Sequence, residues 1–329
     1  MKPAARIELD GKDVTAKWSP HLESLNITDE AGVKSDTCEV SFDNSAGFSA
    51  PPIGSTLRVW LGYEPAPVYM GSYKIDSWSK EGPTRRLSIS AKAADMTSAI
   101  REPKLRSFHE KTVKEIVEEV ATAHGLTAVV DPTIGARTVD HIDQQTESDM
   151  AFLTRLARRQ GATFKMADGK AIFAAKGSRT KPDGSAKAEI ALTLKGNTSW
   201  SAQSSERGSF GAACASYIDP ETKRRGTVTR GSGKVKHRDR RLYATKEEAE
   251  AAAEANLGDL TRGKVTVSVE MPGDPGLFAE ALVTLKDFDP DVDGPYLAKS
   301  VSHSFSSGGF TTSLSLETEG ADTGTDPAD

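Results

Sequence analysis

The spacing of hydrophobic residues changes twice along this chain, and that change restricts its fold more than any other feature. In residues 1–100 apolar side chains alternate with polar ones, as at 38–42 and 57–61, and turns rich in proline and glycine separate these stretches. Helical spacing replaces the alternation over 108–160, and the alternation returns from Glu189 onward. The chain is therefore predicted to hold two β-rich parts with an α/β part between them.

The middle part carries the signals of two helices and a hairpin. Thr112 and Glu115 have the spacing of a capping box, ahead of apolar residues that recur on one helical face. A second helix is predicted over 149–160, and Asp168-Gly169 predicts a tight turn between two short strands. Residues 108–176 are therefore expected to form a small α/β insert.

The strand series of the N-terminal part has a counterpart near the end of the chain. Stretches at 57–61, 73–79 and 87–91 follow one another with nearly the spacing of those at 282–285, 296–302 and 314–317. Two unrelated antiparallel meanders would also look alike at this level. The alternative is that both parts are copies of one module. An alanine-rich helix, with a capping box at Thr245 and Glu248, is predicted to interrupt the second part before Gly258.

Residues 143–161 form the most informative single stretch. Ser148 is placed to accept hydrogen bonds from free backbone N–H groups, and Asp149 puts negative charge at the positive end of a helix dipole. Apolar residues then recur with helical spacing, and Gly161 can end the helix in the left-handed conformation. An ordinary amphipathic helix packed on a sheet would account for these features.

The order of residues in this stretch closely resembles a signature of the phage late control protein D family. The residues that carry it are Gln145, Glu147, Ser148, Asp149, Phe152, Leu153, Arg155, Leu156 and Gly161. Other matching pieces are 112–126, Gly82-Pro83 with 87–95, 294–296, 301–303 and 310–314. They occur in the family's order over residues 80–320. Ala281 departs from the pattern, because a glycine is expected there, and this leaves the turn type before the next strand open.

The resemblance implies a baseplate hub protein of a contractile tail, related to the hub part of type VI secretion spikes. It implies an α+β, mainly β fold in which two tube-like β-barrel modules flank the α/β insert. The corresponding domains are the first module at 1–107, the insert with its linker at 108–188, the second module at 189–319 and a disordered acidic tail at 320–329.

The same resemblance implies a structural protein without enzymatic activity or cofactor. Three subunits of two modules each would form a ring of six similar modules, which suits a hexameric tail tube on one side and a trimeric spike on the other. Other baseplate proteins and a tape measure protein are further expected partners. The expected location is the virion tail baseplate, after assembly in the cytoplasm of a bacterial host.

Composition agrees with such a role. A chain of 329 residues with 37% apolar and 27% charged residues can form several domains, and its net charge of −5 argues against a dedicated nucleic-acid binder. No stretch approaches the roughly 18 apolar residues of a membrane span, and residues 1–8 lack the apolar core of a signal peptide. Cys38 and Cys214 fit no metal spacing and are expected to be small buried thiols.

No pattern for catalysis or metal binding emerges from the sequence. The histidines are scattered without zinc spacing, and His124 and His303 are assigned structural roles. Gly233-Lys234 lacks the leading glycine and the Ser/Thr of a phosphate loop. Glu147 and Asp149 lie two residues apart at a helix start, whereas a glycosidase needs carboxylates on opposite sides of the bond. No catalytic, cofactor-binding or metal-binding residue is therefore assigned.

One segment is strongly basic, with Asp239 as its single acidic residue. Its nine basic residues are Lys223, Arg224, Arg225, Arg230, Lys234, Lys236, Arg238, Arg240 and Arg241. No aromatic residue interleaves within it to stack on bases. A solvated loop or long hairpin is one interpretation, and a docking loop for an acidic neighbour is the other, since clustered charge can steer assembly.

Two functions remain as alternatives to the hub of a phage tail. The first is a peptidoglycan hydrolase at the tail tip, for which the sequence shows no catalytic pattern. The second is the hub of a secretion or injection system that loads effectors, which would share the same fold. We expect no fused spike of the type VI kind, because the sequence has no long β-helical repeat near its end.

Overall fold

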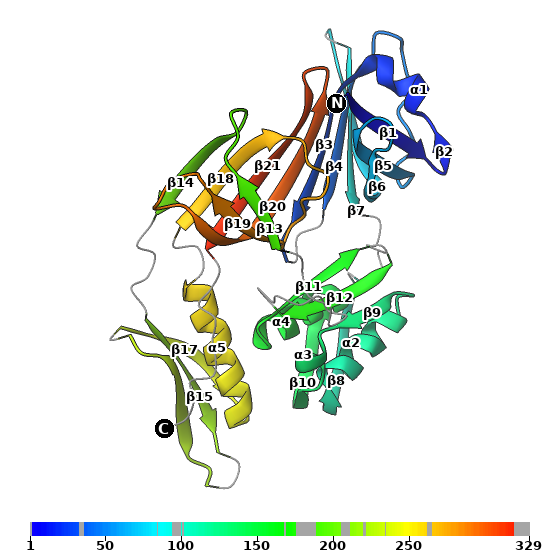
Figure 1. Cartoon of the computed structure of the whole chain (residues 1–329). Helices are drawn as coiled ribbons and strands as arrows, with labels where there is room; N and C mark the ends of the chain where they lie inside the picture. The colour runs from blue at the N-terminus through cyan, green and yellow to red at the C-terminus, as the bar shows by residue number, and fades with distance from the viewer. Residues whose placement is uncertain are drawn as a thin grey trace.

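The chain folds into one large β-sheet and two smaller α/β units, which lie below the sheet in Figure 1. A computed structural model describes residues 2–32, 36–83, 85–93, 100, 102–167, 169–175, 189–204, 211–219, 222–233, 235–261 and 265–318. The predicted linker at 176–188 and the predicted tail at 320–329 lie outside these residues.

The large sheet holds thirteen strands in the order β14-β18-β21-β20-β3-β4-β7-β6-β5-β1-β2, with β19 also beside β20 and β13 beside β19. Its N-terminal strands are β1 (Pro3–Leu9), β2 (Lys12–Asp13), β3 (Leu22–Glu30), β4 (Thr37–Asp43), β5 (Thr56–Tyr63), β6 (Val68–Glu81) and β7 (Arg86–Ala93). Its C-terminal strands are β13 (Glu189–Thr193), β14 (Ser199–Ser204), β18 (Val265–Pro272), β19 (Leu282–Lys286), β20 (Gly294–Ser306) and β21 (Gly309–Thr318). Helix α1 (Thr15–Trp18) and the 3-10 turn η1 (Ser19–His21) connect β2 to β3.

Six strands in each half of the sheet follow the same order. The N-terminal module, β1 and β3 to β7, is arranged β3-β4-β7-β6-β5-β1, and the C-terminal module, β13, β14 and β18 to β21, is arranged β14-β18-β21-β20-β19-β13. Numbered along the chain within each module, both orders are 2-3-6-5-4-1. The one difference is that β1 pairs with β5 antiparallel, whereas β13 pairs with β19 parallel. The predicted repeat of three strands is therefore part of a larger duplication.

Local irregularities recur at matching places in the two modules. A β-bulge lies just before Ser77 in β6 and just before Ser300 in β20. Gly71 and Gly294 have φ of 144° and 145°, a conformation that glycine adopts without strain, and a buried tyrosine follows two residues after each. These shared features align β6 with β20 residue by residue.

The two modules share one sheet because β3 pairs with β20 in an antiparallel ladder. The mainly β fold is as predicted. Among the described residues, however, no strand pairing closes either module into a barrel, since the path of strands runs from β14 to β2 without returning. In the C-terminal module, β20 uses part of its second edge for β3 of the other module. Barrel closure therefore stays a prediction.

Each module buries its own hydrophobic core on one face of the sheet. Alternation along the strands sends every second side chain to this face and leaves the other face polar. The N-terminal core includes Ile7, Trp18, Leu25, Ile27, Cys38, Val40, Phe42, Leu57, Val59, Leu61, Ile75 and Ile89. The C-terminal core includes Leu192, Val267, Val269, Ala281, Val283, Leu285, Phe288, Val301, Leu314 and Leu316.

The α/β insert follows β7 and contains two small sheets and three helices. Its elements are β8 (Pro103–Thr112), α2 (Val113–Thr122), β9 (Thr127–Val130), α3 (Pro132–Gly135), β10 (Thr138–Ser148), α4 (Asp149–Arg159), β11 (Ala162–Ala167) and β12 (Lys170–Ala175). The predicted capping box is present, because Glu115 N donates to Thr112 Oγ1 and Thr112 N donates to Glu115 Oε2. The predicted hairpin is present as the β11–β12 pair, although Asp168 itself lies outside the described residues.

A second unit is inserted between β14 and β18, where the N-terminal module has only the short connection from β3 to β4. It consists of β15 (Ala212–Ile218), β16 (Arg225–Gly231), β17 (Lys236–Tyr243) and α5 (Lys246–Thr261), and we call it the helix-bearing unit. The predicted cap of its helix is present, since Glu248 N donates to Thr245 Oγ1 at 3.2 Å. Helix α5 lies against the insert, because a Cβ placed on Gly161 would lie 3.3 Å from Ala255 Cβ.

Candidate assembly surfaces

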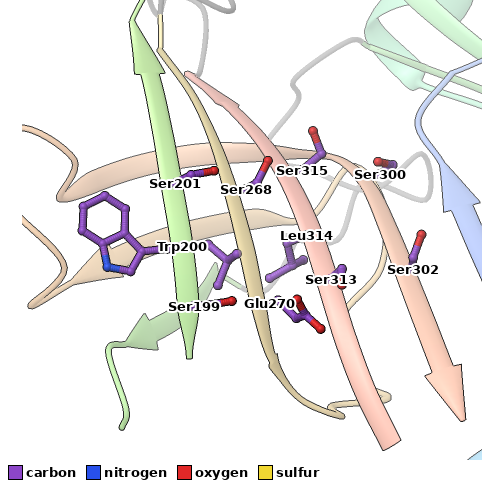
Figure 2. Close-up of a pocket in the computed structure, with 11 residues that line it drawn as sticks. Ser199, Trp200, Ser201, Ser268, Glu270, Ser300, Ser302, Ser313, Leu314 and Ser315 are labelled. Atoms are coloured by element: carbon purple, nitrogen blue, oxygen red, sulfur yellow. The ribbon is translucent and has the colours of Figure 1, made fainter. Parts of the chain in front are cut away.

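One face of the C-terminal module is lined with serine side chains (Figure 2). The first row across β14, β18, β21 and β20 is Ser201, Ser268, Ser315 and Ser300, and the second row is Ser199, Glu270, Ser313 and Ser302. These eight residues border a shallow hollow of about 450 Å³, and we call the surface the hydroxyl face. The residues between them, such as Val269 and Leu314, belong to the core on the other side.

The hydroxyl face continues across the joint between the two modules. Thr28 Oγ1 lies 3.1 Å from Ser302 Oγ, and Ser304 Oγ donates to Asn26 Oδ1 at 2.7 Å. Further serines extend it over β4 and β7, where two paired hydroxyls lie 3.4 Å apart. Small hydroxyls bind water, and they do not titrate near neutral pH. This surface is therefore suited to be a wetted wall.

The hydroxyl face was not identified from the sequence, although its signal is there. Residues 300–306 read Ser-Val-Ser-His-Ser-Phe-Ser, and 312–316 read Thr-Ser-Leu-Ser-Leu. Alternation predicts two strands with one polar face. That nearly all polar positions carry hydroxyls, rather than the usual mixture of charges, is the observation that would have marked the face as special.

The residues of the family motif fix the start, the packing and the end of α4. Ser148 Oγ accepts a hydrogen bond from Ala151 N at 3.2 Å, as predicted for the capping residue. Glu147 forms an ion pair with Arg155, eight residues further along the chain. Gly161 has a φ of 67°, as predicted for the stop. Of the remaining motif residues, Phe152, Leu153, Leu156 and Asp149 are buried and Gln145 is exposed.

Asp149 is fully buried, and four side chains bind its carboxylate. Lys104 Nζ and His124 Nε2 each lie 2.7 Å from Oδ2, while Arg106 Nη2 lies 2.5 Å and Gln144 Nε2 2.9 Å from Oδ1. Burial raises the pKa of Asp149, but hydrogen bonds from Lys104, His124 and Gln144 and the charge of Arg106 outweigh it, so the pKa stays below its ordinary value. From sequence alone Asp149 is expected to interact with the helix dipole only, because its partners come from distant elements.

Lys165 of β11 holds the insert against the large sheet. Its Nζ lies 2.6 Å from Asp29 Oδ1 and 2.8 Å from Asp36 Oδ1, and donates to Glu30 O at 3.2 Å. Asp29 Oδ2 in turn accepts from Ala279 N at 2.8 Å. Burial, reinforced by the charge of Asp29, raises the pKa of Asp36 to about 6. Since β3 lies beside β20, this contact places the insert at the joint between the modules.

The basic segment, for which a solvated loop or a long hairpin is one interpretation, forms two strands that pair with β15 and not with each other. Arg225 and Arg230 lie on β16, Lys236, Arg238, Arg240 and Arg241 lie on β17, Lys223 and Arg224 precede β16, and Lys234 lies outside the described residues. A strand has two faces, and one of them here must pack on α5, which is why a charged segment can still be ordered.

The face of this small sheet that is turned away from α5 is basic. Val228 and Tyr243 pack with the alanines of α5, and Arg230 pairs with Glu250 of the helix at 3.3 Å. Alternation then places Arg225, Lys236 and Arg238 on the opposite face, which we call the outer face. Asp239 accepts from Tyr243 Oη and Asn256 Nδ2 and so turns to the helix side.

His303 and the two cysteines are buried in the folded chain. His303 is buried, with Nδ1 2.9 Å from Thr312 Oγ1 and Nε2 3.2 Å from Leu277 O, and burial lowers its pKa. Cys38 and Cys214 are buried free thiols, as predicted. Within the described ranges, no cluster of three or more His, Cys, Asp or Glu residues is placed to hold a metal ion. No helix in those ranges is long and apolar enough to cross a membrane.

The chain is similar to known proteins in both sequence and fold. Residues 54–309 match the family described as "Phage tail baseplate hub (GPD)". The probable baseplate hub protein of Escherichia phage 186 is 29% identical over 367 aligned positions, which cover 98% of this chain and 94% of the relative. The 43 kDa tail protein of prophage MuSo2 from Shewanella oneidensis has a similar fold, with a TM-score of 0.71 at 16% identity over 96% of this chain and 98% of that one. A component of the E. coli type VI secretion system matches with a TM-score of 0.58 at 13% identity, covering 100% of this chain and 80% of that one.

Proposed function

The chain belongs to the phage tail baseplate hub (GPD) family and serves as a hub of the tail baseplate, and we propose that it does so as a homotrimeric ring. In this ring three subunits supply six similar modules between a hexameric tail tube and a trimeric spike. The observation that carries the proposal is the duplicated strand order of the two modules. A subunit with two copies of one fold can present nearly sixfold edges while keeping true threefold symmetry.

The hydroxyl face supports the same arrangement. A ring built from this sheet must turn one of its faces to the central channel. The other face carries the two hydrophobic cores, and Trp18 of α1 packs into one of them, so the hydroxyl face is the one that can line a channel. A channel wall with a continuous apolar stripe would adhere to whatever passes through it. Rows of serine and threonine avoid this, because they stay hydrated.

We assign the protein a structural role without enzymatic activity of its own. The family description and the name of the phage 186 relative both refer to a hub, which is an assembly role. The carboxylate of Asp149, which the sequence does not assign to catalysis, is held by four side chains and is closed off from solvent. No observation favours the hydrolase or the effector-loading alternative over the phage hub.

The outer face of the helix-bearing unit is proposed as a docking surface for an acidic segment of a neighbouring baseplate protein. Arg225, Lys236 and Arg238 project from two strands on either side of β15, whose own outward residues are small. The exposed side chain of Leu242 on the same face adds an apolar contact. Tape measure, tube and spike proteins remain the expected partners of the ring as a whole.

The experiment that tests the ring is a mass measurement in solution. Light scattering on the purified protein at micromolar concentration, alone and mixed with its spike protein, should give three times the subunit mass of 35.1 kDa. A monomer in both samples would refute the trimer. Clearing of purified cell walls by the protein would refute the non-enzymatic assignment, and a preparation purified identically from cells without the gene controls for contaminating hydrolase.

A further inference from the structure

Part of β6 is uncovered in a way that its counterpart in β20 is not. In β20, residues 300–304 are paired on one edge with β21 and on the other with β3, and Val301 and His303 are buried. In β6 the matching residues, 77–81, pair with β7 on one edge and with no other described strand, and all of them are exposed. An open strand edge of this kind invites pairing with another strand.

The C-terminal module has the complementary open edge. Its β14 occupies the place that β3 holds in the N-terminal module, and it pairs with β18 alone among the described strands. Cross-strand pairs lead from Ser77, next to the bulge in β6, to Asn26 in β3. The corresponding pairs lead from Ser300 in β20 to Ser201 in β14. Two residues further along each strand, Gln203 therefore takes the place of Thr28. The open edge of β14 therefore matches the edge by which β3 pairs with β20. The open edge of β6 matches the edge by which β20 pairs with β3.

We infer that β14 of one subunit pairs antiparallel with β6 of the next, and that this joint repeats between subunits the β3–β20 joint within each chain. The inference rests on the proposed ring and adds its register. Transferring the observed pairs gives Trp78 opposite Ser204, Ser79 opposite Gln203, Lys80 opposite Ala202 and Glu81 opposite Ser201. Because each subunit offers one edge of each kind, head-to-tail pairing can close a ring.

Trp78 provides independent support for this joint. Trp78 is 45% exposed, which is unusual for tryptophan. The residue at the matching position of β20 is Val301, which is 0% exposed and pairs with a residue of β3. In the inferred joint Trp78 is covered by the neighbouring β14, whose own core-side residues include Trp200 and Ala202. Tryptophan is enriched at the centre of protein interfaces, so Trp78 is assigned as the anchor of the joint.

The same register also makes the hydroxyl face continuous around the ring. Ser79 takes the place of Ser302, so it would meet Gln203 on the channel side as Ser302 meets Thr28. Ser77 and Ser79 would then extend the serine rows of the neighbouring C-terminal module. A shift of one residue would instead turn these serines to the core side and Trp78 into the channel. Only the inferred register of β6 and β14 therefore keeps the hydroxyl face continuous between subunits.

Disulfide trapping tests the register directly. The two hydroxyl oxygens of Thr28 and Ser302 lie 3.1 Å apart, so the equivalent variant Ser79→Cys/Gln203→Cys should form a disulfide between subunits under mild oxidation. Seven strand spacings of about 4.8 Å separate β14 from β6 within one chain, so the same pair cannot bridge within a subunit. Thr28→Cys/Ser302→Cys is the positive control, and Ser79→Cys/Ser199→Cys, four residues out of register along β14, is the negative control.

A non-reducing gel of the test variant should show covalent trimer, with dimer as the partly oxidised species and nothing larger. Trp78→Ser should weaken the trimer at least tenfold in its dissociation constant while leaving the thermal unfolding of the subunit unchanged, because Trp78 is exposed there. A trimer in solution that gives no disulfide, or gives it equally in the out-of-register control, would overturn the inferred joint and leave the ring intact. A monomer for every variant, the parent included, would instead refute the ring itself.

Discussion

Replacing Asp149 by asparagine should destabilise the insert by about 3 kcal/mol. The substitution keeps the shape of the side chain but removes the charge that Lys104 and Arg106 bind, and it points an N–H₂ group at donors. Losing one partner of a buried ion pair usually costs about 3–5 kcal/mol. The side chains of Lys104 and Arg106 are 34% and 24% exposed, so both can regain water, and the lower end of that range applies.

Hydrogen exchange measured by mass spectrometry is the suitable assay, because a chain of several modules does not unfold in one step. We expect the backbone amides of α4, β8 and β10 to exchange when the insert unfolds. A destabilisation of about 3 kcal/mol then corresponds to a roughly 100-fold loss of protection against exchange. Glu119→Gln is the matched control. It removes an exposed ion pair with Lys111, which should be worth about 1 kcal/mol or less. Equal protection in the two variants would refute the reasoning.

The pH dependence of the insert gives a second reading of the same network. Because the folded state holds the pKa of Asp149 below its ordinary value, ionised Asp149 favours folding. This contribution is complete above the ordinary pKa of about 4 and is lost as the pH falls through the lower folded value. Wild-type protection in α4 should therefore decline at acid pH below 4, and Asp149→Asn should lack that part of the decline.

Four further predictions follow from the packing and the charges. Leu156→Ala should destabilise the insert by roughly 2–5 kcal/mol, as for a buried large-to-small change, and a neutral effect in the same exchange assay would show that this helix face is not core. Because the pKa of Asp36 is raised to about 6, its protonated form favours folding, so the melting temperature of Asp36→Asn relative to wild type should increase between pH 4 and pH 7. Gly273→Ala should destabilise by roughly 1–3 kcal/mol, because a Cβ would lie 2.1 Å from the ring of Phe310, and calorimetry would detect it. Lys236→Glu/Arg238→Glu should leave the trimer mass unchanged but prevent incorporation into baseplates, seen as hub protein missing from purified particles.

The elements that could be predicted from sequence are those set by short-range chemistry. Ser148 and Thr112 cap helices because a hydroxyl near free N–H groups needs only a few residues to do so. The β11–β12 hairpin and α5 follow from local turn and periodicity signals in the same way. The strand repeat was visible because β19, β20 and β21 pair consecutively, as β5, β6 and β7 do.

What could not be predicted depends on contacts between residues far apart in the chain. The network around Asp149 joins β8, the turn after α2, β10 and α4, and no local spacing reveals that Lys104 and His124 meet one carboxylate. The joint between β3 and β20 brings together residues that are more than 270 positions apart in the sequence, such as Thr28 and Ser302. The basic segment suggests a solvated loop or a long hairpin from sequence alone, because its charges hide the alternation that places Val228 and Tyr243 on α5.

The two ends of the strands differ, and this difference bears on how one ring can satisfy two symmetries. The tips of the β6–β7 and β20–β21 hairpins lie at one end of the sheet and are equivalent in the two modules. The insert after β7 and the helix-bearing unit between β14 and β18 leave from the opposite end, and they are unlike each other. In the proposed ring the hairpin end would therefore repeat six times and the other end only three times. The hairpin end is thus the natural seat for a hexameric tube, and the end that carries the two units is the natural seat for a trimeric spike.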